Sequence, residues 1–355
     1  MLILSGCGSR GEFAFSDANP LEAKQHTILV ATSRKQEDGP YTYGRGRANE
    51  TQFMRFDVSV PGSHKTGQIE WPKDRLNPDK HFYVAKAEKF GTPSDFYRAV
   101  AHNNVTPSGS SEITIFVHGY NTNLAEGVYR VAQMTHDFEG PGTQILFSWP
   151  SAAQAAGYVY DRDSAVHARD RLQSLLEDLA QKSNKKILLI GHSMGSYLVT
   201  ETLRQMSLQK KTAALNKLNG VVLMSPDIDV EVFRSQAKAI KPFPEPFVLF
   251  VARQDRALRL SAFITRTQQR LGSIEYLDGL DDIDVTVIDV TDLADGQGLN
   301  HSVAATSPAA ISVLRGLSGP EELARIRSGH RPETWLGALD ITGNAVRVEL
   351  RRDPP

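Results

Sequence analysis

From residue 113 onward, short and fully apolar segments alternate with longer segments of helical periodicity, and no other feature constrains the fold as strongly. Apolar segments of this length suit strands that are covered on both faces of a sheet. They read ITIFV, TQILFSW, KKILLI, GVVLM, PFVLFV and DVTVIDV. Between two of them, Asp161–Lys182 carries alanine and leucine at helical spacing. Strands that alternate with helices form a parallel sheet, so the sequence predicts an α/β fold.

The first ninety residues have a different pattern. Apolar segments with β-branched residues occur at 26–32, 53–60 and 82–87, and stretches rich in glycine and proline, such as EDGPYTYGRGR (37–47), separate them. We expect antiparallel strands at these three positions. The predicted fold class is thus a mostly parallel, doubly wound α/β sheet with antiparallel N-terminal strands.

The remaining segments are less regular. Residues 89–111 indicate a short helix and a connecting loop, and the apolar pattern decays after residue 318 until a strand-like NAVRVEL at 344–350. We expect three regions: an N-terminal tether-like segment (1–25), the main α/β domain (26–317) and a C-terminal helix-loop-strand appendage (318–355).

Composition excludes several functions. The formal net charge is −1 with 23% charged residues, which gives no indication of a nucleic-acid partner. No apolar run reaches the roughly eighteen residues of a membrane-spanning helix. The single cysteine, Cys7, excludes an intramolecular disulfide. The histidines lack metal-ligand spacing, so we expect neither a metal nor any other cofactor.

The N-terminus MLILSGCGSRGEF allows two interpretations. Gly6, Gly8 and Gly11 spell the dinucleotide fingerprint G-x-G-x-x-G, but the full strand and the helix that this motif needs are missing. Leu4–Cys7 resembles the bacterial lipobox, in which the cysteine becomes lipid-modified. The apolar run is short and lacks a basic region before it, which fits a start upstream of Met1. We therefore expect a lipid-anchored protein of the cell envelope, or a cytoplasmic one if this interpretation is wrong.

Ser193 is the candidate nucleophile. It stands in GHSMG, after the apolar ILLI and before the helical SYLVTETLRQM. The pattern G-x-S-x-G between strand and helix forms a strained turn that exposes the serine hydroxyl, with small residues at Gly191 and Gly195 because strand and helix crowd there. The amide of Met194, at the start of the helix, would then bind the oxyanion.

Several motifs together resemble the α/β-hydrolase superfamily, and within it a bacterial esterase/lipase-like branch of unassigned substrate. They are FVHGYN (116–121), FSWPS (147–151), GHSMG (191–195), MSPDID (224–229) and RQDRAL (253–258). The resemblance spans residues 26–315. It implies a second oxyanion amide in the loop after the third strand of that fold, which here is the loop HGYN, and the amide in that loop is assigned to Tyr120. His118 is interpreted as a turn-stabilising residue, and Asn121 or Asn123 as the N-cap of the following helix.

The same resemblance implies the order serine, acid, histidine for a catalytic triad. His301 and His330 are the histidines after Ser193. His301 follows the last strand-like segment and precedes the helix start Ser307–Pro308, where the base is expected. His330 lies in a polar tail and is interpreted as solvent-facing.

Two locations compete for the acid. Asp255 ends an apolar segment and precedes a helix, the usual position in this fold, so we favour it. Asp227 and Asp229, one strand earlier, are the alternative. In the loop after FSW, Tyr158 and Tyr160 are candidate substrate-pocket residues, and Asp161 is expected to cap its helix.

These inferences predict a serine hydrolase, a carboxylesterase or lipase that acts through an acyl-enzyme on a small-molecule or lipid-like ester. A thioesterase, an amidase or an acyltransferase would use the same residues. A membrane-tethered binding protein that has lost turnover is the alternative from another class.

Overall fold

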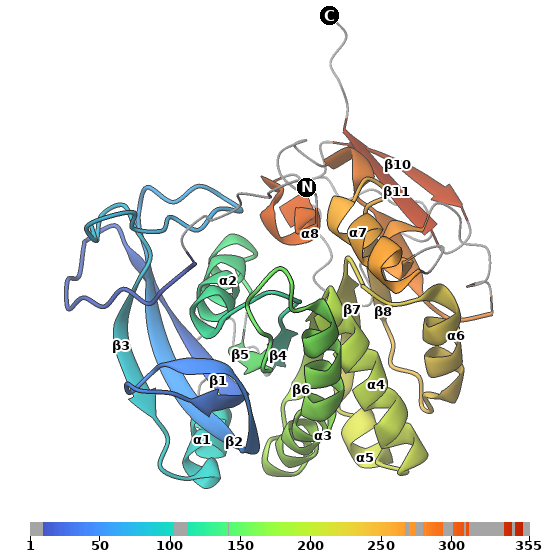
Figure 1. The fold of residues 1–355 in the computed structure, drawn as a ribbon, viewed down its shortest axis with the longest axis horizontal. Coiled ribbons are helices and arrows are strands. Elements are labelled where there is room, and N and C mark those ends of the chain that lie inside the picture. Colours follow the sequence, from blue (N-terminus) through green and yellow to red (C-terminus); the bar gives the residue numbers. More distant parts are fainter. Residues whose placement is uncertain are drawn as a thin grey trace, which may run out of the picture.

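The computed structural model describes residues 10–102, 112–140, 142–266, 270–274, 280, 282–293, 301–308, 310–311, 337–342 and 345–350. These residues form one eleven-stranded sheet of order β10-β11-β9-β8-β7-β6-β4-β5-β1-β2-β3 (Figure 1). The strands are β1 (Lys24–Gln36), β2 (Tyr43–Val60), β3 (Tyr83–Lys89), β4 (Glu112–Val117), β5 (Thr143–Ser148), β6 (Lys186–His192), β7 (Leu218–Met224), β8 (Phe247–Val251), β9 (Thr286–Asp289), β10 (Gly337–Thr342) and β11 (Ala345–Leu350).

The helices connect these strands and cover both faces of the sheet. They are α1 (Pro93–His102), α2 (Leu124–Asp137), α3 (Tyr158–Lys182), α4 (Met194–Leu208), α5 (Thr212–Leu215), α6 (Val230–Ala239), α7 (Arg256–Thr265) and α8 (Val303–Thr306), with 3₁₀ turns η1 (Leu271–Ser273) and η2 (Thr291–Leu293). One hydrophobic cluster packs α1, α3, α4, α5 and α6 against one face. A second cluster packs α2 and α8 against the other.

The six apolar segments of the sequence are the strands from β4 to β9, and neighbours among them pair in parallel. Their side chains point alternately into the two hydrophobic clusters, which is why both kinds of position are apolar. The predicted fold class is confirmed. The helix expected at 161–182 is α3, which begins three residues earlier at Tyr158.

The three predicted N-terminal strands are also present. β1 pairs antiparallel with β2, and β2 antiparallel with β3. The other edge of β1 pairs in parallel with β5, which joins this hairpin to the main sheet. The separator predicted at 37–47 is wrong for its second half, because β2 starts at Tyr43. Pairing with β1, at Gln36↔Tyr43 and Arg34↔Arg47, stabilises a strand there in spite of its glycines.

At the opposite edge, β11 pairs in parallel with β9 and antiparallel with β10 (Figure 1). The strand-like segment of the C-terminal region is therefore a strand of the same sheet.

In the described part of the chain, no helix combines the length and apolar character needed to cross a bilayer.

Candidate active site

Ser193 lies in the turn between β6 and α4, and its backbone is strained. Its φ is 54° and its ψ −122°, values that are rare for a residue with a side chain. The Ser193 amide donates to the carbonyl of Met224 (2.9 Å), and the Ser193 carbonyl accepts from the amides of Ser196 (3.0 Å) and Asp227 (3.2 Å). These bonds hold the serine at the carboxyl end of β6, with Met194 as the first residue of α4.

The two glycines of the motif are required by close packing. A Cβ on Gly191 would lie 2.8 Å from Ser196 Cα. A Cβ on Gly195 would lie 2.3 Å from the carbonyl oxygen of Val117 and 2.4 Å from that of His118. The small residues that the motif places on either side of Ser193 therefore let α4 start directly against β4 and β6.

His301 and Asp255 are brought together, although 46 residues separate them. Nδ1 of His301 lies 2.7 Å from Oδ2 of Asp255, a fully buried carboxylate. Burial alone would lower the pKa of His301, but the hydrogen bond and the charge of Asp255 outweigh it and raise the pKa above 6.5. With its Nδ1–H donated to Asp255, the neutral imidazole presents a lone pair at Nε2, which is what a general base requires.

His192, the residue before Ser193, also contributes to this arrangement, and the sequence did not predict this. Its Nε2 lies 3.1 Å from the carbonyl oxygen of His301, and the two rings are 4.9 Å apart. Burial, followed by the charge of His301, lowers the pKa of His192 to about 3. The neutral ring therefore donates to the His301 backbone and links it to the nucleophile turn. The only signal in the sequence was an imidazole inside GHSMG.

The two alternative acids are engaged elsewhere. Asp229 is the N-cap of α6 and accepts from the amides of Glu231 (3.0 Å) and Val232 (3.2 Å). Asp227 is buried, pairs with Arg270 Nε at 3.1 Å and accepts from the hydroxyls of Tyr158 (2.9 Å) and Ser261 (2.6 Å). Asp255 is thus the carboxylate that contacts His301.

The loop after β4 lies directly against the nucleophile turn. A Cβ on Gly119 would lie 3.0 Å from Ser193 Cβ and 2.7 Å from His192 Nδ1. Tyr120 follows in this loop, so its backbone and that of Met194 are on neighbouring segments. Of the two expected helix caps, Asn123 is the N-cap of α2 and forms a capping box with Glu126. Asn121 instead adopts a positive φ of 56°.

Two buried residues hold this loop from beneath. The His118 ring stacks on Trp149, with centroids 5.0 Å apart, and its Nδ1 bonds the carbonyl of Gly119 at 2.8 Å. Burial, and then the charge of Arg34, lower the pKa of His118 to about 3, so it is a neutral turn-stabilising residue. Arg34 donates to the carbonyls of Thr122 (2.5 Å) and Ser151 (2.9 Å). The sequence analysis did not single out Arg34, because its burial follows from the pairing of β1 with β5.

Asp161 does not cap its helix, which corrects the sequence-based expectation. Asp161 lies inside the first turn of α3, which begins at Tyr158, and the N-cap of this helix is Gly157. Its carboxylate accepts from the amides of Asn121 (3.1 Å) and Ala152 (2.5 Å) and from the hydroxyl of Ser151 (2.6 Å). Asp161 thus ties the loop after β4 to the loop after β5, because both loops reach α3 at the same edge of the sheet.

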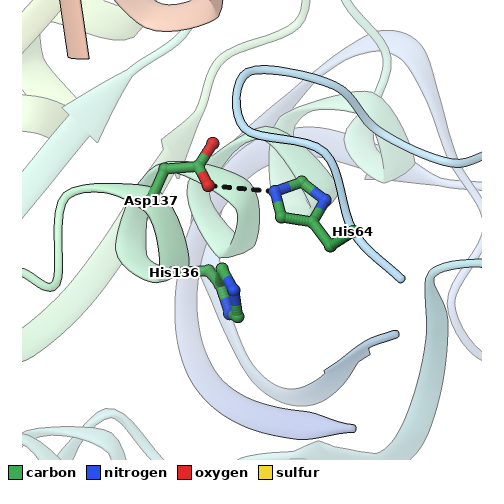
Figure 2. A group of neighbouring side chains, drawn as sticks. All are labelled: His64, His136 and Asp137. Carbon is green, nitrogen blue, oxygen red and sulfur yellow. Dashed lines mark hydrogen bonds and ion pairs between the residues drawn. The ribbon is translucent and has the colours of Figure 1, made fainter. Parts of the chain in front are cut away.

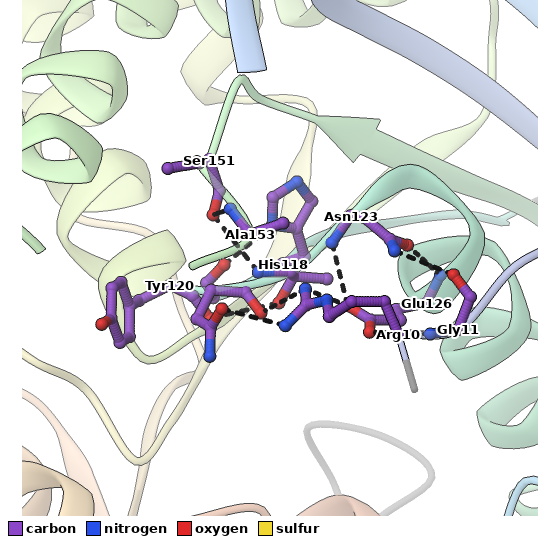
Figure 3. A network of polar contacts seen from close by, with 12 residues as sticks. Arg10, Gly11, His118, Tyr120, Asn123, Glu126, Ser151 and Ala153 are labelled. Carbon is purple, nitrogen blue, oxygen red and sulfur yellow. Dashed lines mark hydrogen bonds and ion pairs between the residues drawn. The ribbon is translucent and has the colours of Figure 1, made fainter. Parts of the chain in front are cut away.

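The N-terminal segment contacts the same loop from outside, as Figure 3 shows. The Arg10 guanidinium donates to the side chain (3.0 Å) and the carbonyl (2.9 Å) of Asn121 and pairs with Glu126 at 2.7 Å. The amide of Gly11 donates to Glu126, and Asn123 donates to the carbonyl of Gly11.

The two candidate pocket tyrosines lie in different places. The Tyr158 ring is 5.5 Å from that of Tyr120 and its hydroxyl bonds Asp227, next to the nucleophile turn. Tyr160 contacts β2: its hydroxyl donates to the carbonyl of Arg45 at 2.6 Å, and Arg47 lies over its ring. Cys7 and His330 lie outside the described residues.

Comparison with known proteins gives one family. The family described as alpha/beta hydrolase of unknown function (DUF900) matches residues 96–317, more than half of the 355-residue chain. An uncharacterized protein of Nostoc sp. strain PCC 7120 is 41% identical over 63 residues, which are 18% of this chain and 16% of that protein.

The chain is also similar to solved hydrolase structures. Aspergillus fumigatus lipase B aligns over 66% of this chain and 59% of its own, with a TM-score of 0.39 and 10% identity. Dienelactone hydrolase from Anabaena variabilis aligns over 86% of this chain and 98% of its own, with a TM-score of 0.38 and 10% identity. The chain therefore spans less than two thirds of the length of both the Nostoc protein and lipase B.

Proposed function

The chain belongs to the family of α/β hydrolases of unknown function whose model matches residues 96–317, and on this premise we propose that it is a serine hydrolase that cleaves carboxylic esters. One observation carries the proposal. His301 Nδ1 lies 2.7 Å from the buried carboxylate of Asp255, while His301 is also linked through His192 to the strained turn of Ser193. An imidazole oriented by a carboxylate beside an unusually held serine is what a nucleophilic hydroxyl needs.

In the proposed reaction, Ser193 Oγ attacks the acyl carbonyl and His301 Nε2 takes its proton. Asp255 keeps the imidazole in the tautomer with Nδ1 protonated and stabilises the imidazolium that forms. The amides of Tyr120 and Met194 donate to the oxyanion. His301 returns the proton to the leaving alcohol, and water then attacks the acyl-enzyme with His301 again as the base.

Within this chemistry we propose an ester and not an amide as the substrate, because an alkoxide is a better leaving group than an amide anion and demands less of the general acid. Thioester hydrolysis, amide hydrolysis and transfer of the acyl group to an acceptor other than water use the same residues. A set of p-nitrophenyl esters, matching thioesters and anilides assayed side by side distinguishes these activities.

The test of the proposal is labelling with a fluorophosphonate probe, which reacts only with an activated serine. We expect the wild type to be labelled and Ser193→Ala to lose both labelling and at least about a thousandfold in hydrolysis. Ser174→Ala, at an exposed position of α3, is the matched control and should behave as wild type. A wild type that folds but is neither labelled nor active would indicate a binding protein without turnover, and full activity of Ser193→Ala would end the triad assignment.

A further inference from the structure

Three histidines and two carboxylates meet at a place that the proposed triad does not use. His64 and Glu70 belong to the loop between β2 and β3, His136 and Asp137 end α2, and His26 lies on β1. His64, His136 and Asp137 lie close together (Figure 2). Each offers one atom that could bind a metal ion, and these three donor atoms lie within 4.8 Å of one another. The side chains of His64 and Asp137 are 4% and 2% exposed, so these two groups are shielded from solvent, while His136 is half-buried.

Asp137 is held so that one carboxylate oxygen faces the cluster. Its Oδ2 accepts from the amide of Gly67 at 2.7 Å and from Nε2 of Gln133 at 2.5 Å. Its Oδ1 points at Nε2 of His64, 2.9 Å away (Figure 2). A carboxylate fixed in this way is oriented to give a single oxygen ligand.

His64 has the arrangement of a metal ligand with an outer partner. While Nε2 faces Asp137, Nδ1 lies 2.8 Å from Oε2 of Glu70. The other oxygen of Glu70 accepts from the amide of Lys65, which holds that carboxylate in place. Histidines that bind metal ions commonly donate their second ring N–H to a carboxylate, which fixes the ring and strengthens the ligand.

His136 completes the group from the helix. Its ring centroid lies 5.1 Å from that of His64, and the rings are nearly perpendicular at 83°. On its other side, His136 Nδ1 lies 3.1 Å from Nε2 of His26. His26 thus holds Nδ1 of His136 as Glu70 holds Nδ1 of His64, and in the proposed site an ion would take Nε2 of each ring.

We propose that His64, His136 and Asp137, with a water molecule as the fourth ligand, form a site for a zinc-class divalent ion. Two imidazole nitrogens and one carboxylate oxygen suit Zn²⁺ better than Mg²⁺ or Ca²⁺, which prefer oxygen alone. Zinc binds these atoms at about 2.0–2.2 Å, which places two ligand atoms of a tetrahedral site about 3.4 Å apart. Donor atoms up to 4.8 Å apart must therefore approach by roughly 1.4 Å, and those of His64 and Asp137, which are 2.9 Å apart, must separate slightly. The neighbours Ser63, Lys65 and Thr66 are exposed, so the loop that carries His64 lies at the surface of the protein.

The site would brace the segment that carries His301. Gly67, which donates to Asp137, packs so closely on Thr306 that a Cβ there would lie 1.8 Å from the Thr306 carbonyl oxygen. Gln133, the other donor to Asp137, also donates to the carbonyl of Ala305 at 3.2 Å. An ion that joins the β2–β3 loop to α2 therefore stabilises the surface against which α8 packs, a few residues after His301.

The inference is tested with the full chain, treated with a chelator and then exchanged into metal-free buffer. We expect one Zn²⁺ to bind per chain, with a rise in Tm that grows with free zinc. Co²⁺ in its place should give the visible absorption bands of a tetrahedral nitrogen and oxygen site. No substrate is involved, so the outcome is independent of the proposed hydrolase function.

Variants separate ligands from outer partners. His136→Gln and Asp137→Asn should each weaken zinc binding by roughly a hundredfold or more and abolish the cobalt bands, while Glu70→Gln should weaken it by about 10–100-fold and keep them. His167→Gln, at an exposed position of α3, is the control and should bind as wild type. Unchanged binding in the ligand variants would overturn the site. If those variants fail to fold, the wild type decides alone: without saturable one-to-one binding and cobalt bands, the cluster is only a network of hydrogen bonds from His64 to Glu70 and Asp137.

Discussion

At the scale of the residue, Asp255 combines two tasks in one carboxylate. Oδ1 accepts from the amide of Leu258 and caps α7, while Oδ2 faces His301. Asparagine is as good a helix cap as aspartate, so the two tasks can be separated by substitution. The position of the acid is therefore open to a test that leaves the helix intact.

Asp255→Asn should fold normally and lose about three to four orders of magnitude in turnover, because the amide favours the wrong tautomer of His301 and cannot stabilise its cation. The measurement is kcat with a p-nitrophenyl ester, with circular dichroism to verify the fold. Asp229→Asn, a substitution at the cap of α6, is the control and should cost little. If instead Asp229→Asn removed activity while Asp255→Asn stayed close to wild type, the acid would belong to the earlier strand.

The pH dependence follows from the same pair. The sequence alone predicts an acid limb near the ordinary histidine pKa of about 6.5, whereas Asp255 raises the pKa of His301 in the folded protein. The base works in its neutral form, so a raised pKa moves the loss of activity to higher pH. We expect the acid limb of kcat/KM to lie above 6.5 in wild type and to move to lower pH in the residual activity of Asp255→Asn. A limb below 6.5 in wild type would contradict the geometry of the pair.

At the scale of the element, the junction of β6 and α4 is built by close approach of backbones. Gly195 lies where α4 passes the end of β4, and the oxygens that a Cβ would meet belong to Val117 and His118. Those two residues lead into the loop that carries Tyr120. The strand β4, the turn of Ser193 and the loop of Tyr120 thus form one packed unit, and we expect a change in one to move the others.

Gly195→Ala should therefore reduce both stability and turnover. Forcing the backbones apart should lower the free energy of unfolding by about 1–3 kcal/mol or more, and turnover should fall because the oxyanion amides move with β4. Denaturant titration and kcat measure the two effects. Gly91→Ala is the matched control, because a Cβ there meets nothing within 4 Å, and it should change neither quantity. Wild-type turnover in Gly195→Ala would mean that the site tolerates a shift of this junction.

At the scale of the whole molecule, the N-terminal segment packs against the loop that follows β4 and the start of α2. Arg10 and Gly11 contact the residues at the start of α2, a few positions after Cys7, the single cysteine of the sequence. We propose that Cys7 is lipid-modified. A lipid anchor at that position would hold the loop around Tyr120 close to the membrane surface, where a lipid-like ester would be found.

The full-length gene product in a bacterial host should then fractionate with membranes and incorporate labelled palmitate, because several acyl chains anchor a protein stably where one is marginal. Cys7→Ser should lose the label and become soluble. Ser193→Ala, which keeps the cysteine, is the control and should stay with the membranes. Equal membrane binding of Cys7→Ser would point to another anchor.

The sequence by itself determined the parallel sheet, the three antiparallel strands and the turn of Ser193. These depend on local signals: apolar segments covered on both faces, and a serine between two glycines at a strand–helix boundary. It also favoured Asp255 and His301, because each follows a recognisable strand.

Tertiary structure alone decided the rest. Several residues contact partners on elements that are distant in the sequence, namely Arg34, His192 and the group of His26, His64 and His136. Asp161 bonds neighbouring loops and does not cap its own helix. The partners of each contact lie far apart in the chain, so a local sequence pattern cannot predict the contact, because it forms only when the strands have paired into the sheet.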